Sequence, residues 1–126
     1  MISGLDHVHI RCGDVERSVK YFEDVFEGKV VSRGESRGFP IIRVDVNGVI
    51  INLHGTDPKA GILEVRKGTR GIDHIAFNVK DLGKTAEYMK KKGAKFSTGP
   101  EVSPRGVKYA FVEGPDGIRI ELLEKP

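Results

Sequence analysis

The chain has 126 residues, 38% of them hydrophobic, which is the size of one ordinary domain with a real core. Its net charge is +3, and its densest basic run, Lys90-Lys91-Lys92, lacks the interleaved aromatic residues that nucleic-acid stacking needs, so we expect a small, anionic substrate and no nucleic acid. It has one cysteine, Cys12, no signal-peptide pattern and no apolar run of about 18 residues, so we expect a cytoplasmic protein with no membrane partner.

The first half of the chain predicts one strand, one helix and three further strands. Residues 5–11 alternate and are rich in β-forming residues, which favours a strand. Asp14 stands at an N-cap position, and apolar residues recur at helical spacing from Val15 until Gly28, which we expect to end the helix. Three short strands are expected near 29–34, 40–47 and 49–54, with a tight Asn47-Gly48 turn before the last one.

The second half repeats this order. A strand is expected from Ile72, and Asp81 precedes a helix whose inner stripe is Leu82, Thr85, Ala86 and Met89 and which ends at Gly93. Three strands follow near 94–98, 106–113 and 118–123, the last after an Asp116-Gly117 turn.

Two pairs of similar segments show that the halves are copies of one module. Leu-Asp-His-Val-His-Ile, at 5–10, matches Ile-Asp-His-Ile-Ala-Phe, at 72–77, and Gly-Val-Ile-Ile-Asn-Leu, at 48–53, matches Gly-Ile-Arg-Ile-Glu-Leu, at 117–122. The sequence therefore predicts an α+β fold of two βαβββ modules in tandem. We expect a single domain over residues 1–126, with modules at about 1–55 and 72–126 and a linker at 56–71.

Strand periodicity predicts which side chains share a face. His7, His9 and Arg11 point to one side of the first strand, and Val8, Ile10 and Cys12 point to the other, which should pack on the helix. In the last strand of each module Asn52 and His54, and Arg119 and Glu121, likewise share a polar face. Polar faces on all these strands suggest a cleft, and converging imidazoles and a carboxylate would suit a divalent metal such as zinc, nickel or iron.

These segments resemble the vicinal oxygen chelate superfamily, which includes glyoxalase I, extradiol dioxygenases, and the fosfomycin and bleomycin resistance proteins. The resemblance covers nearly the whole chain and rests on Leu-Asp-His-Val-His-Ile, on the Asp-Val-Glu-Arg-Ser-Val-Lys-Tyr-Phe segment from Asp14, on Gly-Ile-Asp-His-Ile-Ala-Phe and on Gly-Pro-Asp-Gly-Ile-Arg-Ile-Glu-Leu. It implies a U-shaped mixed-sheet cleft around a metal. It also implies that His7, His74 and Glu121 are ligands of a divalent ion, which could be nickel, zinc, iron or manganese.

The chain departs from glyoxalase I at the fourth ligand position. There glyoxalase I has a glutamate, and this chain has Asn52, which is a poor ligand for these metals. His54 lies on the same face, and we expect it to bind the metal instead or to act as a base beside it. Arg11 resembles the arginine that holds a glutathione carboxylate in glyoxalase I, and we expect Arg11 and His9 to contact the substrate. The Asn-Trp-Gly segment of that family is replaced by Gly-Thr-Asp-Pro from Gly55, which leaves the thiol cofactor open.

The resemblance implies a shared chemistry in which two vicinal oxygens of a small substrate chelate the metal and an enediolate-type intermediate is stabilised. Glu121 is then the expected catalytic base of a glyoxalase I-like lyase or isomerase. Two alternatives remain open: an extradiol-type dioxygenase with ferrous iron, and a non-catalytic antibiotic-resistance-type binding protein. Glyoxalase-like relatives of this length build their sites across a two-fold axis, so we expect a homodimer.

Overall fold

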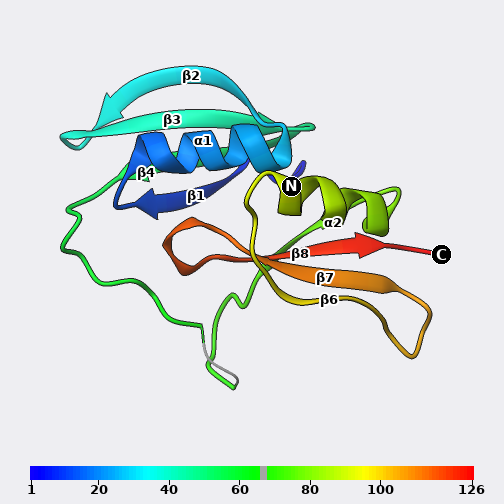
Figure 1. Ribbon diagram of the computed structural model, residues 1–126. Helices are drawn as coiled ribbons and strands as arrows, with labels where there is room; N and C mark the ends of the chain where they lie inside the picture. The colour runs from blue at the N-terminus through cyan, green and yellow to red at the C-terminus, as the bar shows by residue number, and fades with distance from the viewer. Residues whose placement is uncertain (66–67) are drawn as a thin grey trace. The chain divides into compact units, whose positions relative to one another are not determined.

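The computed structural model describes residues 1–65 and 68–126 and divides into two compact units, residues 1–61 and 62–126. Each unit contains one main helix and one four-stranded sheet (Figure 1). The first unit consists of β1 (His7–Cys12), α1 (Val15–Phe26), β2 (Lys29–Ser36), β3 (Phe39–Val46) and β4 (Val49–Gly55). The second unit consists of β5 (Ile75–Asn78), α2 (Leu82–Lys91), β6 (Phe96–Val102), β7 (Lys108–Glu113), a 3₁₀ turn η1 (Pro115–Gly117) and β8 (Arg119–Glu124).

Both sheets have the same topology. The strand order is β1-β4-β3-β2 in the first unit and β5-β8-β7-β6 in the second. The first strand of each sheet runs parallel to the last strand of its module, and the other neighbours are antiparallel. The prediction of two βαβββ modules is therefore confirmed.

The segment between the two modules contains no regular element in the part that the structure describes. Residues 56–65 and 68–74 form neither helix nor strand, and the remaining two residues of the predicted linker, 66–67, lie outside the described residues. Within the described residues, no helix is long and apolar enough to cross a membrane.

Aspartate caps begin both helices, as the repeat predicts. The Asp14 carboxylate accepts a hydrogen bond from the backbone N–H of Arg17 at 3.1 Å, and the Asp81 carboxylate accepts one from the N–H of Lys84 at 3.0 Å. Each bond satisfies one of the N–H groups that a helix leaves without an intrahelical partner. A short polar side chain at the same place in both modules thus fixes where each helix starts.

The end of α1 differs in detail from the expectation. The residue in the left-handed conformation is Glu27, with φ 55°, while Gly28 follows it and donates its N–H to the Phe22 carbonyl at 2.8 Å. A Cβ on Gly28 would lie 2.7 Å from Cγ1 of Val44 on β3. Gly28 is therefore required by the close approach of the helix end to the sheet, and not by its own φ. Gly93, after α2, does have a positive φ of 92°.

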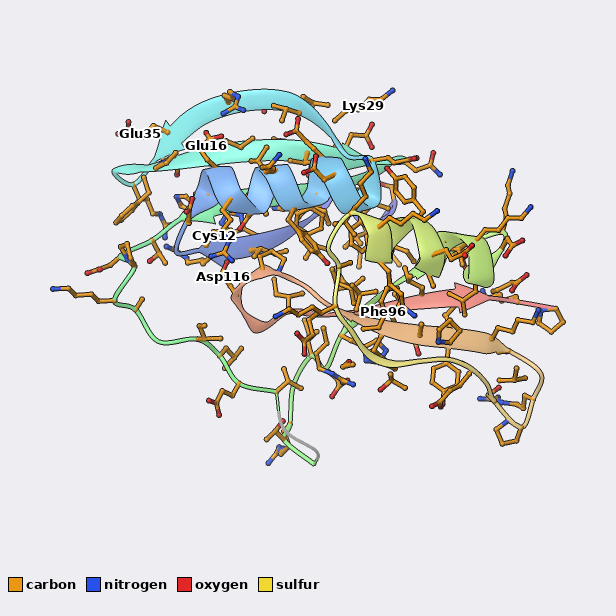
Figure 2. All side chains as sticks on the ribbon, viewed as in Figure 1. Cys12, Glu16, Lys29, Glu35, Phe96 and Asp116 are labelled. Atoms are coloured by element: carbon orange, nitrogen blue, oxygen red, sulfur yellow. The ribbon has the colours of Figure 1, made fainter. Side chains whose placement is uncertain are left out.

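The apolar core of each unit lies between its helix and one face of its sheet. In the first unit α1 contacts β3 and β4, and in the second α2 contacts β6, β7 and β8. Ile10 and Cys12 are buried as expected, and Figure 2 shows Cys12 at the end of β1. The apolar side chains buried from the helices and last strands are Val15, Val19, Phe22, Val25, Ile51 and Leu53 in the first unit, and Leu82, Ala86, Met89, Ile120 and Leu122 in the second.

Strand β6 departs most from its predicted range. It is predicted near 94–98 but runs from Phe96 to Val102, and its pairing with β7 is irregular between Phe96 and Thr98 and again between Thr98 and Glu101. Such irregularities accommodate residues that cannot continue a regular ladder. The irregular pairing thus lets the strand continue past Gly99 and Pro100 to Val102.

Candidate metal-binding residues

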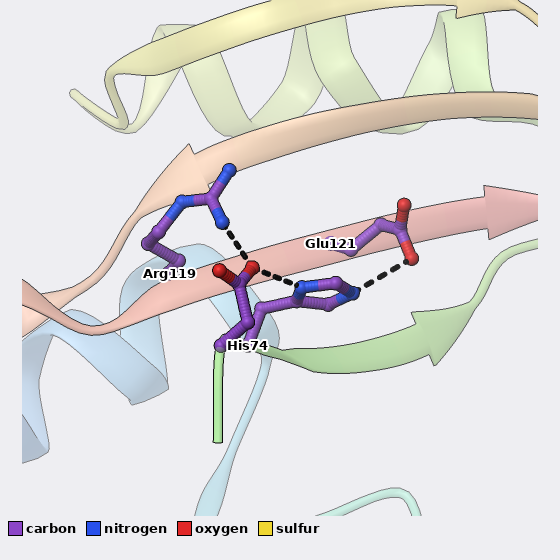
Figure 3. A network of polar contacts seen from close by, with 4 residues as sticks. His74, Arg119 and Glu121 are labelled. Carbon is purple, nitrogen blue, oxygen red and sulfur yellow. Dashed lines mark hydrogen bonds and ion pairs between the residues drawn. The ribbon is translucent and has the colours of Figure 1, made fainter. Parts of the chain in front are cut away.

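The second unit brings together two of the predicted metal ligands. His74 lies directly before β5, and Glu121 lies on β8, the parallel neighbour of β5. His74 Nε2 is 3.3 Å from Glu121 Oε1, and Figure 3 shows the two side chains pointing at each other. Two ligand atoms of one zinc-like ion, each about 2.0 to 2.2 Å from it, lie about 3 to 3.5 Å apart. The separation of His74 and Glu121 therefore fits a shared cation.

The preceding residue, Asp73, fixes the orientation of His74. Nδ1 of His74 donates to Oδ2 of Asp73 at 2.7 Å, and the Arg119 guanidinium donates to the same oxygen (Figure 3). These contacts hold the pKa of Asp73 below its usual value, first through the hydrogen bond from His74 and also through the charge of Arg119. Because Nδ1 donates to Asp73, Nε2 is the nitrogen of His74 that faces the Glu121 carboxylate and would bind a cation held between the two side chains.

Phe111 of β7 supports the same group of side chains. It lies opposite Glu121 in the antiparallel pairing of β7 and β8. The ring of His74 packs edge-on against the Phe111 ring with centroids 5.0 Å apart, and Cζ of Arg119 lies 4.5 Å from the Phe111 centroid. One aromatic ring thus contacts both the imidazole and the guanidinium that hold Asp73.

The first unit contains the corresponding histidine in a similar contact. Nδ1 of His7 donates to Oδ2 of Asp6 at 2.7 Å, as in the Asp73–His74 pair. Asp6 also faces Arg43 of β3, with a guanidinium nitrogen 3.8 Å away. The pKa of Asp6 is lowered by these partners, chiefly by the hydrogen bond from His7. In both modules the aspartate before the histidine therefore leaves Nε2 as the available nitrogen.

A chain of hydrogen bonds links the other polar residues of the first unit. Nε2 of His54 donates to the Ser36 carbonyl at 2.8 Å, so its Nδ1 is the acceptor of the bond from His9 Nε2, at 3.1 Å. His9 Nδ1 in turn accepts from Nδ2 of Asn52 at 3.5 Å. Both nitrogens of His54 thus have protein partners in this arrangement, and neither presents a free lone pair to a metal.

Asn52 has one atom that this chain leaves unpaired. Its side chain is 5% exposed, and Oδ1 is buried with no hydrogen-bond partner. Asn52 occupies the strand position that Glu121 occupies in the second module, in the repeat Gly-Val-Ile-Ile-Asn-Leu and Gly-Ile-Arg-Ile-Glu-Leu. A buried amide oxygen without a partner is costly, and a cation or a hydrogen-bond donor at this place would satisfy it.

The predicted substrate-binding residues lie on the same face of β1. Arg11 and His9 are exposed, and their strand partners on β4 are His54 and Asn52. The pKa of His9 is lowered, first by the partial desolvation of its ring and then by the neighbouring positive groups, of which His54 is the leading one. This face therefore favours a neutral imidazole at His9 beside the cationic Arg11.

The predicted ligands are divided between the two units. His7 and His54 belong to the first unit and His74 and Glu121 to the second, and of these the structure pairs His74 with Glu121. Over the residues that the structure describes, neither unit contains a group of three or more His, Cys, Asp or Glu side chains that could hold a metal ion. That residues of both units bind the same metal ion stays a prediction.

Sequence reasoning missed the residues that hold these histidines. An aspartate directly before His7 and before His74 is visible in the repeat, and its contact with the imidazole could have been inferred from it. The contacts of Asp6 with Arg43 and of Asp73 with Arg119 depend on which strands are neighbours, and carried no signal in the sequence.

Comparison with known proteins identifies the family. The model of the Glyoxalase/Bleomycin resistance protein/Dioxygenase superfamily matches residues 4–122. The chain is 28% identical to a probable lactoylglutathione lyase of Synechocystis over 94% of its own length and 92% of that protein. It is 27% identical to a lactoylglutathione lyase of Arabidopsis thaliana and 30% identical to glyoxalase I of Saccharomyces cerevisiae, and it spans only 43% and 44% of those two proteins.

Solved structures have the same fold. A glyoxalase family protein from Enterococcus faecalis superimposes with a TM-score of 0.84 at 17% identity, covering 97% of this chain and 98% of that one. The fosfomycin resistance protein FosX of Listeria monocytogenes, in complex with Mn(II) and sulfate, superimposes with a TM-score of 0.74 at 18% identity, covering 100% of this chain and 95% of that one. With the duplicated βαβββ module and the match over residues 4–122, the chain belongs to the Glyoxalase/Bleomycin resistance protein/Dioxygenase superfamily.

Proposed function

We propose that this protein is a metal-dependent, glyoxalase I-like lyase or isomerase acting on a small substrate with vicinal oxygens. The observation that carries the proposal is the His74–Glu121 pair, whose facing atoms are 3.3 Å apart, with Asp73 holding the other imidazole nitrogen. Several relatives of similar length are named lactoylglutathione lyase, including that of Haemophilus influenzae, at 28% identity over 90% of that protein. The family and the donor atoms thus support the same chemistry.

The proposed metal ligands are His7, His74 and Glu121. Imidazole nitrogen and carboxylate oxygen suit nickel, zinc, iron or manganese as divalent ions. Either Asn52 or His54 would complete the set, and we favour Asn52 because its Oδ1 is buried and unpaired while both nitrogens of His54 have partners. When bound, the metal supplies Lewis-acid polarisation of the two vicinal substrate oxygens.

Glu121 is the proposed base. Its side chain is only 16% exposed, and one carboxylate oxygen faces His74, so its second oxygen can take a proton from one substrate carbon and return it to the neighbouring carbon. Asn52, at the corresponding position of the first module, has no group that exchanges a proton at neutral pH. Of these two residues, Glu121 alone is therefore proposed to transfer the proton.

Arg11 and His9 are the proposed substrate contacts. Both are exposed on β1 next to the strand that carries Asn52. A guanidinium binds a carboxylate through two parallel hydrogen bonds, so an anionic group of the substrate is expected at Arg11. Both ring nitrogens of His9 already have partners, His54 and Asn52. The neutral His9 can therefore form a hydrogen bond with the uncharged part of the substrate only by giving up one of these two bonds.

Metal analysis followed by turnover tests the proposal. The purified protein should contain about one divalent ion per site and convert the hemithioacetal of methylglyoxal with glutathione or another thiol. Replacing His7, His74 and Glu121 together by Ala should abolish metal binding and turnover, whereas Glu23→Gln, at an exposed position of α1, should change neither. Full metal retention by the triple variant would exclude these residues as ligands.

A second function shares the same ligand set. Two imidazoles and one carboxylate, as in His7, His74 and Glu121, are the ligands of non-haem ferrous oxygenases. If Asn52 is not a ligand, this arrangement leaves open positions for dioxygen and a catechol. Oxygen uptake with catechol and ferrous iron, without activity on hemithioacetals, would favour the dioxygenase over the lyase.

A further inference from the structure

The Asp–His pair of each module has a cationic partner, and the two partners come from different strands. His7 and His74 each donate from Nδ1 to the preceding aspartate at 2.7 Å. In the second module the aspartate is also held by Arg119, which starts β8. In the first module the cation is Arg43 of β3, whose nitrogen is 3.8 Å from Asp6.

The two modules have exchanged the cation and the apolar residue at corresponding positions. Arg43 lies opposite Asn52 in its sheet, and Phe111 lies opposite Glu121 in the other, so Arg43 and Phe111 correspond. The residue that corresponds to Arg119 in the repeat is Ile50. The guanidinium in the second module is therefore on the same strand as Glu121, two residues before it.

Arg119 is also held more firmly than Arg43. Its Cζ lies 4.5 Å from the Phe111 centroid, and the same ring packs against His74. The side chains of Arg119 and Asp73 are 38% and 49% exposed, so the ion pair between them adds little to the stability of the fold. What the pair does fix is the position of the Asp73 carboxylate, and through it the ring of His74.

We propose that Arg119 is a positioning residue for metal binding, which acts through Asp73 to hold Nε2 of His74 toward Glu121. Arg43 has the same kind of contact with Asp6 at a longer distance and has a smaller effect on His7. In the second module His74 and Glu121 are then held firmly in place as ligands, whereas His7 in the first module is held less firmly. This inference rests on the proposed metal-dependent function.

Metal affinity tests the inference with a matched pair of variants. Arg119→Met removes the guanidinium but keeps an apolar side chain over Phe111, and Arg43→Met is the corresponding change in the first module. Titration calorimetry with Mn²⁺ and with Zn²⁺ should show a loss of about 10- to 100-fold in affinity for Arg119→Met, the range typical of residues that orient ligands. Arg43→Met should lose less, and Arg119→Lys should recover part of the affinity by restoring the charge.

A second measurement on the metal-free protein separates positioning from metal binding. Nitrogen-15 NMR of the imidazoles should show His74 with its proton on Nδ1 in the wild type, and a mixture of the two tautomers in Arg119→Met. The melting temperature of Arg119→Met should stay close to that of the wild type. A tautomer ratio and a metal affinity both unchanged in Arg119→Met would overturn the inference.

The two proposals fail in different ways. If Glu121→Gln abolishes metal binding and Arg119→Met leaves both the metal affinity and the His74 tautomer ratio unchanged, the metal site stands and the role of Arg119 is wrong. If the wild-type protein binds no divalent ion, the proposed function is wrong, and the NMR comparison alone decides whether Arg119 orients His74.

Discussion

On the candidate substrate face, the fold changes the pKa of His9. Its pKa is lowered from 6.5, first by partial desolvation of the ring and then by nearby positive groups, which are His54, His7, Arg11 and Arg37. The unfolded chain therefore binds a proton at His9 at a higher pH than the folded chain does. The free energy of unfolding should fall as the pH drops below about 6.5 and should level off below the folded pKa.

NMR titration of the metal-free protein checks this prediction directly. The His9 ring signals should titrate below pH 6.5, and urea unfolding at pH 7.5 and pH 5 should show a smaller loss of stability on acidification for His9→Gln than for the wild type. A His9 midpoint at or above 6.5 would contradict the expected desolvation and charge repulsion.

Arg11 is expected to bind the substrate without supporting the fold. It lies exposed on β1, on the face opposite the buried Ile10 and Cys12, so Arg11→Ala leaves the helix-packing face unchanged. The change should alter the free energy of unfolding by no more than about 0.5 kcal/mol and should raise KM. Arg17→Ala, at an exposed site on α1, is the control for a lost surface charge. A large drop in melting temperature with unchanged kinetics would make Arg11 a structural residue.

At the scale of elements, substitutions at two neighbouring positions at the end of α1 should change the stability of the fold in different directions. Gly28→Ala brings a Cβ to within 2.7 Å of Val44 Cγ1 and 3.0 Å of the Phe22 carbonyl oxygen, and should cost about 1 to 3 kcal/mol, as overpacking does. Glu27→Gly relieves a left-handed non-glycine residue and should leave the stability unchanged or raise it by up to about 1 kcal/mol. Urea unfolding of the two variants measures both effects, and equal effects would show that the close approach to Val44 is not the constraint.

At the scale of the whole molecule, we expect a homodimer, as the family resemblance implies. His7 belongs to one unit and His74 to the other, and family members of this length suggest a homodimer that combines ligands from two chains. When His7→Ala and His74→Ala chains are mixed, each heterodimer should then contain one site with both mutations and one intact site. The intact site should restore metal binding and activity. No recovery in a verified heterodimer would mean that each site is built within one chain.

The sequence by itself determined the modules, their element order and most element bounds. These depend on local signals, namely side-chain alternation, the Asp14 and Asp81 caps and the Asn47-Gly48 turn, and the repeat provided each signal twice. The family resemblance also implied that His74 and Glu121 bind the same metal ion, and the structure brings their side chains to within 3.3 Å of each other.

Only the tertiary structure decided which polar side chains contact each other. The pairing of β1 with β4 sets His9 beside Asn52, and so creates the chain that engages both nitrogens of His54 and leaves Oδ1 of Asn52 unpaired. In the second module, the neighbouring strands β5, β7 and β8 set His74, Phe111 and Arg119 together. Such contacts depend on strand order and register between residues far apart in the chain, which no local pattern encodes.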